Sequence, residues 1–355
     1  MTVSAHPLPG HGAARVPGAG PGRVRLAVCV ATVAACVPYL TIKIAWLSGS
    51  TVGWNDVDAA KDSALYVGNA ITMGMDAAAV LVALAFTFRW GLRIPAWAVL
   101  APIWIAAGLL APIAVAVPLG SALQTLTSSE PLTGTDNALQ GWVYAVVYSG
   151  FTVQGLGLLT AFVLYARTRW PDVFTSRTRD VPEGATHALQ RLLAFGAAGP
   201  AAVVALTDLF WALGGTAGLT ADEIRDRTVL QQTVNGVSGL LTAAGAGALL
   251  LIVLRAGRPR GFVPPLAAAW VGSGATFAGS LYALLVMLGR PAHLASGCTV
   301  AEAMTALGGV LAGLVMGLTG AVLLVEKSVP GGAGGRPPAA DPDGQMARPI
   351  ASSTP

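Results

Sequence analysis

Apolar residues in this chain gather in long runs separated by short polar stretches, and they do not alternate with polar residues. A helix needs ~20 consecutive apolar residues to cross the hydrocarbon core of a bilayer. The pattern therefore predicts an all-α fold, a polytopic transmembrane helix bundle of eight spans. The predicted spans are 26–47, 68–88, 95–117, 141–166, 192–214, 230–254, 264–288 and 301–325.

Composition supports a membrane location for most of the chain. Of 355 residues, 54% are hydrophobic and 11% are charged, whereas soluble domains carry about 25% charged residues. The lipid bilayer is the expected partner, and no nucleic-acid partner is expected. The first apolar run is too long for the core of a signal peptide, so we expect it to remain as an anchor.

The basic residues indicate how the chain is threaded, because Lys and Arg near helix ends favour the cytoplasmic side. One side of the predicted bundle carries Arg15, Arg23, Arg25, Arg89, Arg93, Arg167, Arg169, Arg177, Arg179, Arg191, Arg255, Arg258, Arg260, Lys327, Arg336 and Arg348. The other side carries only Lys61, Arg225, Arg227 and Arg290. Both termini are therefore predicted to be cytoplasmic.

The predicted spans divide the chain into two halves with polar ends. The divisions are a disordered cytoplasmic N-terminal tail (1–24), a first transmembrane half (25–170), a cytoplasmic linker (171–191), a second transmembrane half (192–327) and a disordered cytoplasmic C-terminal tail (328–355).

The two halves share a sequence pattern at their first helix ends. The segment TIKIAWLSGSTVGWND from Thr41 matches ALTDLFWALGGTAGLTAD from Ala205. This match sets Trp46 on Trp211 and Lys43 on Asp208, and it sets Gly49 and Gly53 on Gly214 and Gly218. Because each half has four spans, the pattern predicts a 4+4 parallel internal repeat, related by an axis along the membrane normal.

Three ionisable residues fall within the predicted spans, where charge is expensive. Lys43 and Asp208 occupy equivalent places in the repeat, which gives the hypothesis that they pair across its axis. Asp76, in AITMGMDAAAVLV, is expected at a similar depth, so the three could form one cluster. Two alternatives remain open: Lys43 can extend to the interface beside Trp46, and Asp76 can serve as a polar clamp between helices.

The candidate binding residues combine these charges with neighbouring tryptophans and asparagines. They are Lys43, Asp76, Asp208, Trp46, Trp211, Asn69 and Asn235. No catalytic residue and no metal ligand is predicted, because the chain has no H-E-x-x-H, G-x-x-x-x-G-K-[ST] or G-x-S-x-G motif. No cofactor and no enzymatic activity is therefore expected.

Three stretches resemble a group of actinobacterial multi-pass integral membrane proteins without an assigned activity. They are VPYLTIKIAWLSGSTVG, GNAITMGMDAAAVLVALAF and RIPAWAVLAPIWIAAGLLAPI, all in the first three spans. The resemblance implies a location in the bacterial cytoplasmic (inner) membrane and implies nothing catalytic.

Two classes of function follow from these features. The first is a protein that binds or translocates a small solute or ion through a polar site in the outer half of the bundle. The second is a non-catalytic membrane scaffold or signalling accessory protein that acts through protein partners.

Overall fold

The computed structural model describes residues 22–58, 63–127, 139–178, 184–256, 261–289 and 298–328. Within them, eight helices are long and apolar enough to cross a membrane. They are α1 (Arg23–Leu47), α2 (Ser63–Thr87), α3 (Ala96–Thr127), α4 (Gly141–Arg169), α6 (His187–Ala212), α8 (Val229–Val253), α9 (Val263–Gly289) and α10 (Val300–Ser328). Three short helices connect them, η2 (Arg89–Arg93), α5 (Pro171–Thr175) and α7 (Ala221–Arg225).

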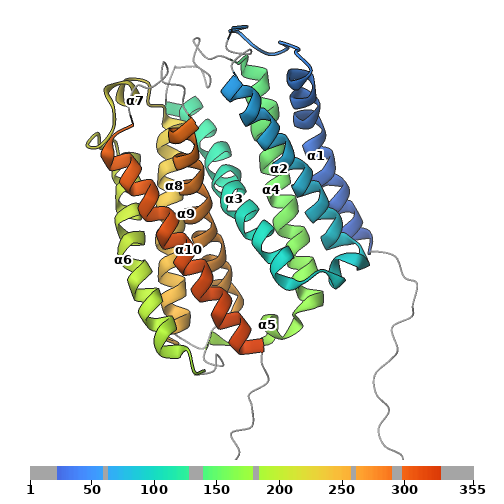
Figure 1. Ribbon diagram of the computed structural model, residues 1–355, viewed down its shortest axis with the longest axis vertical. Coiled ribbons are helices and arrows are strands. Elements are labelled where there is room, and N and C mark those ends of the chain that lie inside the picture. The colour runs from blue at the N-terminus through green and yellow to red at the C-terminus, as the bar shows by residue number, and fades with distance from the viewer. Residues whose placement is uncertain are drawn as a thin grey trace, which may run out of the picture.

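The prediction of an all-α polytopic bundle of eight spans is confirmed, and the helix ends differ from it in detail. α3 runs to Thr127 as one helix although it contains three prolines, so it is longer than the predicted span. The predicted linker 171–191 contains α5 and the start of α6. Both predicted tails lie almost wholly outside the described residues. α1 begins and α10 ends at the same end of the bundle, the lower end in Figure 1.

The four long helices of the second half form a closed ring. In sequence order, each packs along the next, and α10 returns to pack along α6. Glu326, near the end of α10, accepts hydrogen bonds from the backbone N–H of Thr186 (3.1 Å) and from Nε2 of Gln190 (2.9 Å) at the start of α6. These bonds hold the ring together at the end of the bundle where α1 begins and α10 ends.

The first half has the same order of helices, but its ring is open at one edge. α1 packs along α2 and α4, and α4 packs along α3, whereas α2 makes little contact with α3 and lies against α4. α3 instead packs along α8 and α9 of the second half and joins the two halves (Figure 1).

The halves meet where two helices cross at glycines. A Cβ atom on Gly108 of α3 would collide with the backbone carbonyl of Gly274 on α9, so the two backbones are in direct contact. Trp104 of α3 donates from its indole nitrogen to the hydroxyl of Ser273 at 3.1 Å. Trp270 of α9 stacks on Phe162 of α4, with ring centroids 6.0 Å apart. Each half therefore places one indole against the other half.

The matched segments found in the sequence adopt the same conformation. Trp46 donates from its indole nitrogen to the carbonyl of Val52 (2.8 Å), and Trp211 donates to the carbonyl of Ala217 (3.0 Å). The matched glycines at 49, 53, 214 and 218 have φ angles of 90°, 78°, 95° and 86°, which glycine adopts most readily. These contacts support the parallel repeat, which stays a prediction for the remaining helices.

We expect Gly274→Ala to destabilise the bundle by about 1–3 kcal/mol, the usual cost of overpacking. The new methyl group would lie 2.7 Å from the carbonyl oxygen of Trp104. The matched control is Gly279→Ala in the same helix, where a Cβ meets nothing within 4 Å. Unfolding of the purified protein in mixed detergent micelles measures both variants. Equal stability of the two variants would show that the helix crossing tolerates added volume.

Candidate functional site

Lys43 is buried in the first half, and only 5% of it is exposed. Its ammonium group donates a hydrogen bond to Oδ1 of Asn69 on α2. The Nζ atom also lies 4.7 Å from the ring centroid of Tyr39 and 5.3 Å from that of Trp46. A desolvated cation over two aromatic faces gains on the order of 1–2 kcal/mol from each. Lys43 is therefore held inside the bundle and does not extend to its surface.

The spacing of residues on α1 explains this arrangement. Tyr39, Lys43 and Trp46 follow one another at intervals of one helical turn, so they share the face that α1 turns toward α2 and α4. Trp46 is fixed by its bond to the carbonyl of Val52. Tyr39 is fixed by an edge-on contact with Phe151 of α4, at a centroid separation of 5.1 Å.

Asp76 of α2 is the second buried ionisable residue of this site, with 4% of it exposed. Its Oδ1 atom accepts a hydrogen bond of 3.1 Å from Nε2 of Gln154 on α4. Its Oδ2 atom has no hydrogen-bond partner among the described residues, although it is fully buried. An unsatisfied buried polar atom typically costs about 1–3 kcal/mol.

The Asp76 carboxylate interacts electrostatically with the Lys43 ammonium and with the nearby thiol of Cys36. We call the group of Lys43, Asn69, Asp76 and Gln154 the polar site. It sets hydrogen-bond donors and an open acceptor side by side between α1, α2 and α4. This combination can bind a small polar solute or an ion, since the free acceptor at Oδ2 favours a partner with a donor or a positive charge.

The structure brings Lys43, Asp76, Asn69 and Trp46 together, but it separates them from Asp208, Trp211 and Asn235. α6, which carries Asp208, packs along α8 and α10, while α1 packs along α2 and α4. The two helices lie on opposite sides of the bundle (Figure 1). The hypothesis that Lys43 and Asp208 pair is therefore wrong. The two halves meet through α3, α8 and α9, so the first helices of the two halves lie apart.

Asp208 lies half-buried beside α8, where a Cβ on Gly239 would be 3.1 Å from its own Cβ atom. Asn235, the residue of the second half that corresponds to Asn69, is half-buried on α8. Lys43 and Asn69 are joined by a hydrogen bond, whereas Asp208 and Asn235 share none in the described part of the chain. The two equivalent places therefore have different chemistry.

The sequence analysis selected neither Gln154 nor Tyr39. Both residues touch the charges of the polar site. For Tyr39 a signal was available, because it stands one turn before Lys43 on the same helix face. For Gln154 none was available, because the contact between α2 and α4 depends on the open edge of the first half.

No protein-family model, no curated protein and no solved structure matches this chain. The resemblance to actinobacterial membrane proteins therefore stays a prediction. The fold alone defines the class of this chain, an integral membrane protein whose described residues contain eight helices of membrane-spanning length.

A double-mutant cycle between Lys43→Met and Asp76→Asn tests the electrostatic link within the polar site. We expect a coupling free energy of about 1–3 kcal/mol, because each single change leaves the other group buried without its opposite charge. The free energy of unfolding in mixed micelles is the measurement.

The control cycle combines Lys43→Met with Asp208→Asn. These residues lie on helices that do not pack side by side, so their effects should add within about 0.5 kcal/mol. Coupling in the control cycle and additivity in the test cycle would contradict the arrangement described above.

Proposed function

We propose that this chain is a membrane protein that binds a small polar solute or ion at the polar site and carries it across the bilayer. The supporting observation is the buried Oδ2 atom of Asp76, which has no hydrogen-bond partner in the described structure and lies near the buried ammonium of Lys43. Ionisable groups at such depth in a membrane protein commonly mark solute or ion pathways.

The orientation belongs to the same proposal. With both termini cytoplasmic, as the distribution of arginines favours, the polar site lies in the outer half of the inner membrane. The solute would be one that offers a hydrogen-bond donor or a positive charge to Asp76. Its acceptor groups, if it has them, would meet the ammonium of Lys43.

The open edge of the first half supplies a route to the site. α8 is covered by α3 at its outer end, where a Cβ on Gly120 would lie 3.1 Å from Cβ of Thr233. The outer end of α2 lacks such cover, and Val67 there is 55% exposed. Movement of α2 would therefore expose the polar site without breaking a packed contact with α3.

Two native cysteines on α1 allow a direct test. Cys36 is 1% exposed and lies near Asp76. Cys29, nearer the start of the same helix, is 3% exposed and belongs to an apolar cluster. Cys298, the third cysteine, is exposed and is removed as Cys298→Ser. The probe is a membrane-impermeant trimethylammonium methanethiosulfonate, added to intact cells.

We expect Cys36 to react and Cys29 to remain unmodified, as judged by mass spectrometry of the purified protein. Asp76→Asn should slow the reaction of Cys36 with this cationic reagent by roughly 5- to 10-fold relative to a neutral reagent, because 1.4 kcal/mol corresponds to a factor of ten. Cys29→Ala and Cys36→Ala identify the modified thiol.

A scaffold protein gives the opposite result. In that case both thiols stay inert in the folded protein, and Asp76→Asn alters stability alone. Inert Cys36 together with normal folding would therefore reject a solute-binding role for the polar site and would favour the scaffold.

A further inference from the structure

A small apolar cluster closes the outer end of the first half. It is built from Ile42 and Trp46 of α1, Val143 of α4, and Trp54 of the loop that joins α1 to α2. The indole of Trp54 lies against that of Trp46, with ring centroids 5.2 Å apart. Leu139, which precedes α4, and Val146 and Val147 of α4 pack around these residues. We call this group the indole cluster.

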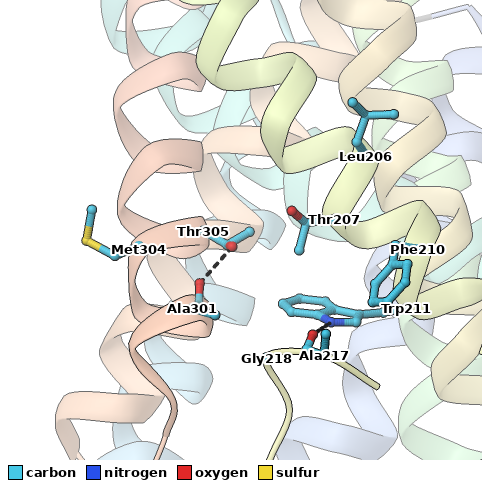
Figure 2. Close-up of a pocket in the computed structure, with 9 residues that line it drawn as sticks. All are labelled: Leu206, Thr207, Phe210, Trp211, Ala217, Gly218, Ala301, Met304 and Thr305. Atoms are coloured by element: carbon cyan, nitrogen blue, oxygen red, sulfur yellow. Dashed lines mark hydrogen bonds between the residues drawn. The ribbon is translucent and has the colours of Figure 1, made fainter. Parts of the chain in front are cut away.

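The corresponding place in the second half is an apolar groove of about 570 Å³ between α6 and α10 (Figure 2). Figure 2 shows Trp211 reaching from α6 toward α10, beneath Thr207 and opposite Ala301. The groove is lined by Leu206, Thr207, Phe210, Trp211, Ala217, Gly218, Ala301, Met304 and Thr305.

The groove residues match the indole cluster position by position. The match of Trp46 with Trp211 also sets Ile42 on Thr207. Gly53 faces Trp142 and Val143 at the start of α4, and Gly218 faces Ala301 at the start of α10, which sets Val143 on Ala301. The same register sets Val146 on Met304 and Val147 on Thr305. Five members of the indole cluster thus correspond to five residues that line the groove.

Two members of the indole cluster have no equivalent among the groove residues. The register sets Leu139 on residue 297, which lies outside the described residues. The other member is Trp54, whose ring lies against that of Trp46. Trp54 corresponds to Leu219. The backbone there is the same in both halves, because Trp54 N–H donates to Thr51 at 3.1 Å and Leu219 N–H donates to Thr216 at 3.2 Å. The second difference is Val143, which is fully buried, against Ala301, which is exposed.

In the second half the walls formed by α6 and α10 are therefore present, but the indole ring that lies between the corresponding walls of the first half is absent. Met304, in the wall of the groove, is 61% exposed. The first half also shows what these walls accept, a flat ring whose nitrogen needs no partner. Nε1 of Trp54 is buried and makes no hydrogen bond among the described residues.

We propose that the groove between α6 and α10 binds a membrane-dissolved small molecule through a planar, largely apolar ring of about the size of an indole. The ring takes the place that Trp54 takes in the first half. The groove has a volume within the usual range of about 300–1,000 Å³ for small-molecule sites. Its lining contains no ionisable side chain, so a charged solute is not its ligand. This site is separate from the polar site and does not depend on it.

The experiment uses 5-fluoroindole as the probe and ¹⁹F NMR as the measurement, with the full chain in lipid nanodiscs and empty nanodiscs as the blank. We expect saturable binding to the wild type at one site. The double variant Leu219→Trp/Ala301→Val transfers the filling residues of the first half to the second. It should weaken probe binding at least tenfold while the protein unfolds at the same or a higher temperature.

The reciprocal variant Trp54→Leu/Val143→Ala opens the indole cluster and should add a second binding site for the probe. Met304→Trp provides a further block of the groove from its opposite wall, in case the double variant does not fold. It should also weaken binding at least tenfold.

Three results would overturn the proposal. One is wild-type affinity in a folded blocked variant. Another is binding that does not saturate above the empty nanodiscs. The third is equal displacement of the probe by a saturated fatty acid, which would show that the groove holds acyl chains and does not select rings.

Discussion

The structure depends on one constraint, that a charge placed among apolar helices must find polar or aromatic partners within the bundle. The ammonium of Lys43 finds such partners in Asn69 and two aromatic rings. One carboxylate oxygen of Asp76 accepts a hydrogen bond from Gln154, and the other has no partner among the described residues. These contacts join α1, α2 and α4, and they hold α2 against α4. A register one residue longer, which sets Asn69 on Asn235, sets Asp76 on Thr242. Thr242 is neutral, and its hydroxyl accepts a hydrogen bond of 2.9 Å from Thr276 of α9. The second half also closes its ring, while the first does not.

The same comparison explains why two halves of similar pattern have different surfaces. The polar site lies in the first half, and the matching place in the second half holds a neutral residue. The groove lies in the second half, and the matching place in the first half is filled by an indole ring. Asp76 corresponds to Thr242, and Leu219 corresponds to Trp54. At the polar site the difference is Asp76 against Thr242, and at the groove the differences are Trp54 against Leu219 and Val143 against Ala301.

The fold could be predicted from the sequence because long apolar runs leave few alternatives, and the spans were found at nearly the right places. The turn after each first helix could also be predicted, since Trp46 and Trp211 stand before glycines at matching intervals. The pairing of Lys43 with Asp208 could not be tested in this way, because matched residues need not be adjacent. Adjacency depends on which helices join the two halves, and here α3 and α9 meet through Gly108 and Gly274. The role of Gln154 depended in turn on where α2 settles, a matter of tertiary packing.

The position of α3 has a consequence for how the protein is assembled. α3 is made early but packs along α8 and α9, which are made late. During synthesis, the first four helices enter the bilayer with one flank of α3 still against lipid. The second half, whose ring closes on itself, has no such dependence. The N-terminal half therefore completes its packing only after the C-terminal half has been inserted. A substitution in α8 or α9 can for this reason affect the polar site in the first half.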